Sequence, residues 1–185
     1  MGRRAQISRP AILDAALAIA DEHGLTGVTM AAVAARLDVT AMALYRHVAG
    51  KDDLLDGLVE VLLTELPPPA AELPWQERLQ YLAGALRSTA ARHPAVFPLL
   101  LQRPAATGQA RQVRDSVCAA LRQAGLDAEQ AARAERLIST AILGFATSEA
   151  AGRFDHHSPD VRDSDFACLL NGIHTLITLG PAQQT

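Results

Sequence analysis

The sequence predicts an all-α protein of about nine helices, and three observations point to this fold class. Of the 185 residues, 49% are hydrophobic, so the chain can bury a sizeable core. Alanine and leucine dominate that fraction and only 4% of the residues are aromatic, a composition that favours helix over sheet. Apolar residues recur at the spacing of a helical face between capping residues, glycines and prolines, and no alternating strand pattern occurs.

A pair of short helices joined by a tight turn is predicted within residues 29–51. Thr29 can cap the first of them, because its hydroxyl can accept a bond from an unpaired backbone N–H. Asp38 tolerates the backbone of a turn, and Thr40 is expected to cap the second helix. Leu44 would point inward and leave the opposite face exposed. This pattern is a helix-turn-helix, whose second helix could enter a DNA major groove.

The other helices are bounded by local signals along the chain. They are expected at about 9–23, 51–66, 75–92, 96–101, 109–124, 128–151 and 164–179. Gly24 should stop the first helix, and Pro98 should interrupt the short one. Asp127 and Gln130 have the spacing of a capping box. The polar stretch 152–163 is expected to be a loop.

The net charge of the whole chain argues against a polycation that binds nucleic acid over its entire surface. The formal net charge is −3 at pH 7 and the isoelectric point is about 6.0. Positive charge is local instead, and it gathers at the N-terminal end in Arg3, Arg4, Arg9, Arg36, Arg46 and Lys51. No apolar run is long enough to span a membrane, and no hydrophobic region follows the first arginines as in a secretion signal. We therefore expect a soluble, cytoplasmic protein with no membrane partner.

The sequence gives little support for catalysis or metal binding. Cys118 and Cys168 lie far apart without a metal-ligand spacing, which favours free, buried thiols. The run Asp155-His156-His157 could bind a metal, but it is short and lacks regular ligand spacing, so a solvated loop is favoured. No paired carboxylates, Ser-His-Asp set or glycine-rich phosphate loop occurs. We expect neither an enzyme nor a bound metal or cofactor.

One stretch resembles a known family. The run Ala43-Leu-Tyr-Arg-His-Val-Ala-Gly-Lys-Asp-Asp-Leu-Leu55, preceded by Gly24-Leu-Thr-Gly-Val-Thr29, is similar to the N-terminal domain of the tetracycline-repressor (TetR) family. The resemblance covers about residues 8–60, and its motif is more specific than a bare helix-turn-helix pattern. It implies a DNA-binding domain at residues 1–51 and an effector-binding and dimerisation domain at 52–185.

The resemblance implies two kinds of DNA contact. The positions expected to face bases are Ala41, Met42, Ala43 and Arg46, and those expected to hold phosphate are Thr29, Thr40, Tyr45, His47 and Lys51. Arg46 can bond guanine in bidentate fashion, whereas the apolar side chains can only meet thymine methyl groups. Lys51 lies at a helix N-terminus, which attracts anions. Arg3 and Arg4 are expected either to contact DNA as a basic arm or to be a disordered tail.

A regulator of this kind would enclose an effector within its middle helices. The candidate lining residues are mostly apolar and comprise Leu86, His93, Phe97, Leu100, Leu101, Arg114, Val117, Cys118, Leu121, Ile138 and Ile142. Such a pocket would suit a hydrophobic small molecule, with one or two hydrogen bonds from the histidine or the arginine. The alternative is that these residues simply form the core.

The last two helices are expected to form a homodimer interface, as the resemblance implies. Small residues on one helix would let its partner approach closely, and the next helix is apolar on more than one side. The expected interface residues are Gly144, Ser148, Gly152, Phe166, Leu169, Leu170, Ile173, Leu176 and Ile177. Packing within one chain is the alternative.

These observations lead to one functional hypothesis. The chain would be a dimeric transcriptional repressor that binds a palindromic double-stranded DNA operator and is released by a hydrophobic small-molecule effector. A transcriptional activator and a ligand-independent DNA-binding protein remain open alternatives.

Overall fold

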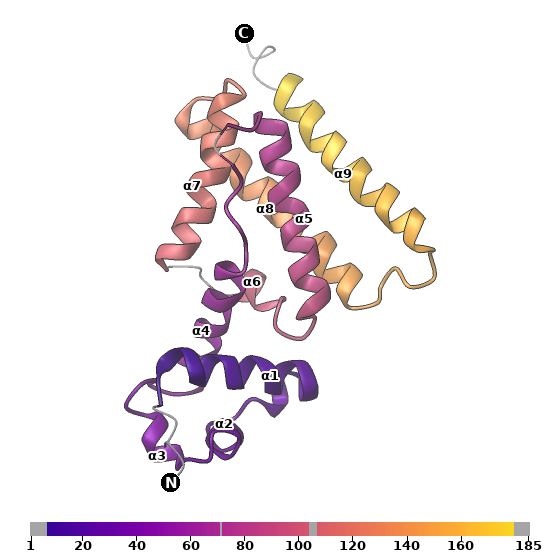
Figure 1. The fold of residues 1–185 in the computed structure, drawn as a ribbon. Helices are drawn as coiled ribbons and strands as arrows, with labels where there is room; N and C mark the ends of the chain where they lie inside the picture. The colour runs from indigo at the N-terminus through magenta and orange to yellow at the C-terminus, as the bar shows by residue number, and fades with distance from the viewer. Residues whose placement is uncertain (1–6, 71, 104–106, 180–185) are drawn as a thin grey trace. The chain divides into compact units, whose positions relative to one another are not determined.

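The computed structural model describes residues 7–70, 72–103 and 107–179. Over these ranges the chain is built of helices without a strand, which confirms the all-α fold (Figure 1). The described helices are α1 (Arg9–Gly27), α2 (Met30–Arg36), α3 (Ala41–Leu44), α4 (Lys51–Thr64), α5 (Trp75–Arg92), α6 (Leu99–Gln102), α7 (Gly108–Gln123), α8 (Ala128–Ala150) and α9 (Pro159–Leu179). None of these described helices is both long and apolar enough to cross a bilayer.

Contacts divide the chain into two compact units. The first unit comprises residues 1–62 and 93–105, and the second comprises 63–92 and 106–185. The first unit therefore holds α1 to α3, most of α4, and α6, while the second holds α5, α7, α8 and α9. The functional boundary expected between residues 51 and 52 stays a prediction, because contacts group the first turns of α4 with the helix-turn-helix.

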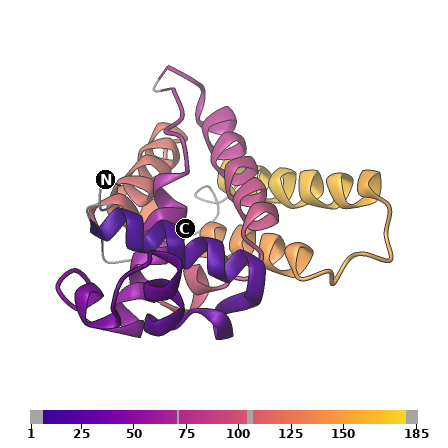
Figure 2. The same ribbon diagram turned by 60° about the horizontal axis from the view of Figure 1, so that its bottom comes forward.

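In the first unit, α1 lies alongside α2, and α2 lies alongside α3 (Figures 1 and 2). Ser8 caps α1 through its hydroxyl, which accepts the Ala11 N–H at 3.4 Å. Gly24 takes a non-helical conformation with φ 72°, so the helical path breaks where the sequence predicted a stop. Apolar side chains from each helix fill the core, and those without exposed surface include Ile12, Ala16, Val33, Leu44, Leu54, Leu58 and Phe97.

The two expected threonine caps turned out differently. The Thr29 hydroxyl accepts the Ala32 N–H at 3.0 Å, as predicted. Thr40 occupies the N-cap position of α3, as predicted, but its side chain makes no capping bond. The N–H that a cap would take, that of Ala43, is bonded at 2.9 Å to the backbone carbonyl of Thr40 instead. A helix of a single turn needs no more than this tight backbone turn to start.

Gly57 lies where α4 packs against α1, and it allows a close approach. A Cβ at this position would collide with the Leu13 side chain, with Cδ1 at 3.1 Å and Cδ2 closer still. Leu13 is itself buried in the core of the unit. We predict that Gly57→Ala destabilises the protein by about 1–3 kcal/mol, because overpacking a close-packed interior forces strain.

The matched control is Gly84→Ala on α5, where a Cβ would meet nothing within 4 Å. This second substitution should stabilise by roughly 0.5–1 kcal/mol through helix propensity. Chemical denaturation of both variants measures the difference. A stability gain in the Gly57 variant equal to that of the control would show that α1 and α4 do not approach so closely.

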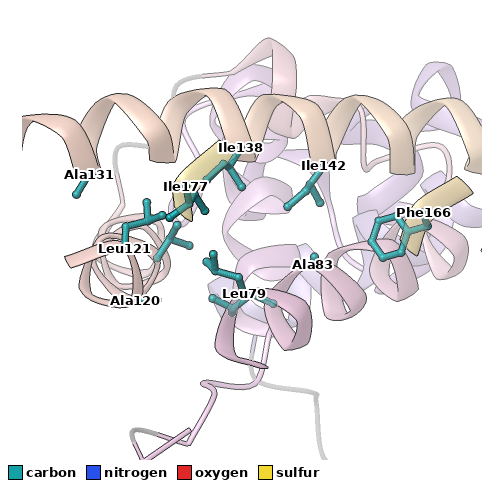
Figure 3. Close-up of a cluster of buried hydrophobic side chains, with 11 residues drawn as sticks. Leu79, Ala83, Ala120, Leu121, Ala131, Ile138, Ile142, Phe166 and Ile177 are labelled. Carbon is teal, nitrogen blue, oxygen red and sulfur yellow. The ribbon is translucent and has the colours of Figure 1, made fainter. Parts of the chain in front are cut away.

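The second unit packs α5, α7 and α8 around one apolar cluster. Figure 3 shows Ile138 and Ile142 of α8 directed toward Leu79 of α5 and Leu121 of α7. Phe166 from α9 reaches the same cluster. The cluster of buried side chains is completed by Leu82, Ala83, Val117, Ala120, Ala131 and Ile177. The predicted amphipathic stripes of these helices therefore meet in a single core.

The start of α8 is fixed by the capping box that the sequence predicted. The Asp127 carboxylate accepts the Gln130 N–H at 2.9 Å, and the Gln130 side chain accepts the Asp127 N–H at 3.0 Å. Both donors would otherwise be unpaired at the helix end.

The helix α9 begins earlier than predicted. It starts at Pro159, inside the stretch 152–163 that was expected to be a loop. Ser158 accepts the Val161 N–H at 3.4 Å, and proline suits a first helical position where no N–H is needed. Asp160 adds a carboxylate in the first turn, which the helix dipole favours. Polarity alone therefore suggested a loop where these three residues start a helix.

An arginine of α5 joins the three long helices of the second unit. The Arg87 guanidinium donates to Glu149 of α8 at 2.6 Å and lies 2.8 Å from the Asp163 carboxylate of α9. It also lies over the Phe166 ring, 4.8 Å from the centroid. The bond to Glu149 is the main reason that the pKa of Arg87 is raised.

Candidate DNA interface and ligand-binding region

The helix α3 and the turn after it present an exposed face in the first unit. Met42 is 76% exposed and Tyr45 is 51% exposed, and Arg46 and His47 are exposed as well. Leu44 has no exposed surface, so α3 is held by one face and free on the other. Ala41 and Ala43 are half-buried. An exposed arginine among apolar side chains can bond a guanine edge while its neighbours meet thymine methyl groups.

The expected phosphate contacts surround this face. Lys51 is exposed and is the first residue of α4, where backbone N–H groups also favour an anion. Thr29 and Thr40 are exposed at the starts of α2 and α3. Arg3 and Arg4 lie outside the described residues. The roles of all these side chains toward DNA remain predictions.

The turn between α3 and α4 is held by Arg9, which the sequence marked only as part of the local positive charge. Arg9 bonds both Asp53 oxygens, at 2.7 and 3.1 Å, and donates to the His47 carbonyl at 3.1 Å. Asp53 in turn accepts the Ala49 N–H at 2.7 Å. The network joins the start of α1 to the turn that carries His47 and precedes Lys51. Its members lie up to 44 residues apart, so no local signal could have revealed it.

Asp53 also makes this network sensitive to acid. The Arg9 guanidinium, followed by the Ala49 amide, holds the pKa of Asp53 below its ordinary value. A carboxylate with a lowered pKa stabilises the folded state at pH values above its unfolded pKa, and that contribution is lost as the pH falls.

The structure divides the expected effector residues between the two units. His93, Phe97, Leu100 and Leu101 belong to the first unit and the remaining seven to the second. His93 is engaged there, with its Nδ1 atom 2.8 Å from Asp21 Oδ2. Phe97 is fully buried, whereas Leu101 is exposed. Whether this set binds an effector stays a prediction.

In the second unit, most of the expected effector residues help to form the core. Val117, Leu121, Ile138 and Ile142 belong to its buried cluster, and Leu86 packs against that cluster. Cys118 is half-buried, and burial raises the pKa of its thiol. Arg114 is exposed. A ligand would therefore meet Val117, Leu121 and Ile142 only by taking space that the core now fills.

A cavity of about 700 Å³ lies between α8 and α9. It is lined mainly by apolar side chains, with the polar Gln130 and Arg133 on its α8 side. The lining includes Leu137, Ile138, Ala141, Leu169, Ile173, Leu176 and Ile177. Leu137 is 68% exposed and Leu176 is 74% exposed, so this face is apolar and open in the single chain. Figure 2 shows the loop after α8 from which α9 turns back.

The expected interface residues fall into three groups. Leu169, Leu170, Ile173 and Leu176 of α9 are half-buried or exposed, and three of them line the cavity. Phe166 and Ile177 are buried in the core of the unit. Gly144, Ser148 and Gly152 are half-buried. The participation of any of them in an interface is untested by a single chain.

The paired histidines do not gather further ligands. The rings of His156 and His157 lie 4.0 Å apart, and Asp155 pairs with Arg162 at 3.4 Å. Among the described residues, no group of three or more His, Cys, Asp or Glu side chains is placed to hold a metal ion.

Comparison with known proteins shows the class to which this fold belongs. Residues 12–58 match the family described as bacterial regulatory proteins, tetR family, and residues 68–172 match the family described as tetracyclin repressor-like, C-terminal domain. The chain belongs to the tetR family of bacterial regulatory proteins, which confirms the resemblance seen in residues 24–55.

Individual relatives agree with this assignment. The HTH-type transcriptional repressor DrrR1 of Streptomyces coeruleorubidus is 28% identical over 167 residues, which cover 89% of this chain and 62% of that protein. The chain thus matches a little under two thirds of the length of this relative.

Two solved structures are similar over nearly the whole chain. The TetR family protein ActR of Streptomyces coelicolor, in complex with (S)-DNPA, is 25% identical with a TM-score of 0.82, covering 95% of this chain and 99% of that one. BioQ with its double-stranded DNA operator is 27% identical with a TM-score of 0.75, covering 92% and 99%; another BioQ structure is from Mycobacterium smegmatis.

Proposed function

We propose that this protein is a cytoplasmic, DNA-binding transcriptional repressor that binds a palindromic operator and leaves it when a hydrophobic small molecule binds. One observation carries the DNA-binding part. The helix α3 is anchored by the buried Leu44 and exposes Met42, and the turn that follows it exposes Arg46, in the same unit that carries the exposed Lys51. BioQ, a structural relative, has been solved with its operator, which supports this use of the fold.

The exposed side chains divide the work of binding. Arg46 reads base edges, since a guanidinium can make two parallel bonds to guanine. Lys51 holds a phosphate at the start of α4 and fixes the register without reading sequence. With few other donors on α3, the shape of the DNA supplies further specificity.

The response to a small molecule belongs to the second unit. ActR, a structural relative, has been solved with (S)-DNPA, which supports a ligand-binding role for the same fold. The apolar character of the expected lining, for example Val117, Leu121 and Ile142, suits a hydrophobic effector. An activator, or a DNA-binding protein without a ligand, would use the same DNA-binding face and is the second candidate.

The protein acts as a homodimer through α8 and α9. The apolar face that includes Leu137, Ile173 and Leu176 is open in the single chain, and a second copy would cover it. Two copies related by a two-fold axis would present two α3 helices about one DNA turn apart, the arrangement that reads a palindrome.

Coupling between the two ligands tests this function. A varied panel of apolar compounds is first ranked by the rise in melting temperature, and the strongest compound serves as the effector probe. We predict that this compound weakens operator binding in a fluorescence-anisotropy titration. Operator DNA should weaken binding of the compound by the same factor in calorimetry, because linkage is reciprocal. Equal compound affinity with and without DNA would contradict the effector mechanism, and a panel with no shift would count against the pocket.

A further inference from the structure

The start of α4 carries an excess of negative charge, which is unfavourable for the phosphate contact proposed for it. Lys51 brings one positive charge, while Asp52, Asp53 and Asp56 bring three negative ones within six residues. All of them are at least partly exposed. DNA phosphates are anions, so carboxylates beside a phosphate contact oppose binding at distances within the screening length, about 8–10 Å in physiological salt. The turn therefore needs further cations to accept a phosphate.

Arg103 supplies such a cation from a distant part of the sequence. It follows α6 directly and lies in the same unit as α4. Its Nη1 atom donates to Asp56 Oδ1 at 2.6 Å and to the Asp52 carbonyl at 3.2 Å, and its Nη2 atom donates to Asp52 Oδ1 at 2.7 Å. One guanidinium thus binds two carboxylates and one backbone carbonyl of α4.

The backbone of Arg103 is held in place by the end of α6. The Arg103 N–H bonds the Leu99 carbonyl at 2.9 Å, and Leu99 is itself buried. The Arg103 side chain is only 21% exposed, whereas its partner Asp52 is 89% exposed. The arginine is therefore the fixed member of the pair, and the carboxylate is the member that faces solvent. The side-chain bonds to Asp56 and Asp52 hold the pKa of Arg103 above its ordinary value, and the bond to Asp56 is the larger cause.

The charges of the turn then balance. Arg9 pairs with Asp53, and Arg103 pairs with Asp52 and Asp56. Without these two arginines the turn would carry two excess negative charges next to the residue proposed to hold phosphate. With them the excess disappears, and Lys51 and the N-terminus of α4 face the solvent in a locally neutral setting.

We propose that Arg103 is a positioning residue for DNA binding, which neutralises Asp52 and Asp56 and fixes the first turn of α4 so that Lys51 can hold a phosphate. This inference rests on the proposed function, in which α4 approaches DNA. Arg103 itself does not read bases and does not touch the DNA. It acts by removing repulsion and by tying the segment after α6 to the turn that meets the backbone.

The test compares affinity for duplex operator DNA in variants of the full chain. Arg103→Gln should weaken binding about tenfold at low salt, because two exposed carboxylates lose their counter-charge near phosphate, and the ratio to wild type should shrink as salt rises. Adding Asp52→Asn and Asp56→Asn to that variant should restore the affinity to within about twofold of wild type. Melting temperatures check that each variant is folded.

A matched triple variant controls for net charge. Arg122→Gln with Asp115→Asn and Glu77→Gln makes the same three changes of charge at exposed positions of α7 and α5. This control should bind within about twofold of wild type at the same salt. The two asparagine substitutions are expected to raise the affinity of the Arg103→Gln variant. If the control gained as much affinity over wild type, the effect would come from bulk charge, and the proposal would be overturned.

The remaining outcomes are distinguishable. If the Arg103→Gln variant binds as tightly as wild type, the inference is wrong while the proposed function stands. If it binds weakly and the two asparagine substitutions restore nothing, repulsion from Asp52 and Asp56 is not what Arg103 removes, and the inference is again wrong. If the wild-type protein binds no duplex DNA at any salt, the proposed function itself falls.

Discussion

Replacing Leu176 with aspartate is expected to convert the proposed dimer into a monomer and to weaken binding to a palindromic operator by more than about 100-fold. Leu176 is 74% exposed on α9 and lines the apolar cavity beside α8. In a two-fold interface each substitution occurs twice, so two carboxylates would enter the same apolar contact. Burying an unpaired charge costs several kcal/mol, and here the cost is incurred twice.

The loss of DNA binding follows from the loss of the second half-site contact. A dimer binds its second half-site at a high effective concentration, and a monomer loses this advantage. Tyr81→Asp is the matched control, because it adds the same charge at an exposed aromatic side chain of α5 outside the cavity. Sedimentation gives the mass, and anisotropy gives the affinity. A Leu176→Asp protein that kept the mass of a dimer would place the interface elsewhere.

Removing Arg46 or Lys51 should weaken DNA binding in two different ways. Arg46→Ala should lower affinity for the preferred site by about 1–3 kcal/mol and leave other sites little changed, since a bidentate base contact is lost. Lys51→Ala should weaken every duplex alike and reduce the salt slope by about one, since a phosphate contact is lost. Each side chain is exposed, so neither change should alter the fold.

The comparison needs a preferred site, a scrambled site and a range of salt concentrations. Arg122→Ala, at an exposed position of α7 in the second unit, controls for the loss of one positive charge. If both test variants lost affinity in the same proportion on both sites, the division between base reading and phosphate holding would be wrong.

The parts of the fold that were predictable from sequence depend on neighbours within a few residues. Thr29, Gly24 and the Asp127–Gln130 box each act on backbone groups one helical turn away or less, so their residue types were sufficient. The capping bond expected of the Thr40 side chain is absent, and the Ala43 N–H bonds the Thr40 backbone carbonyl instead. Local rules assume a helix long enough to leave its first N–H groups unpaired.

The contacts that position the proposed site could not be predicted in this way. The pairs Arg9–Asp53 and Arg103–Asp52 join residues 44 and 51 positions apart, and their partners are chosen by how helices pack. In the sequence, Asp52 and Asp53 are simply two acids that follow Lys51, with no sign of their partners. Packing between helices also decides that α6 belongs to the first unit. The expected effector residues, which were grouped by their order along the chain, are therefore divided between the two units.

Selection of bound DNA from a random duplex pool tests the central claim most directly. The exposed face of α3 and the proposed two-fold pairing through α8 and α9 together predict a recovered palindrome, with half-sites about one helical turn apart. The Arg46→Ala variant should then recover the same spacing with a blurred base preference. Recovery of no enriched sequence, or of an asymmetric single site, would contradict a symmetric DNA-reading regulator.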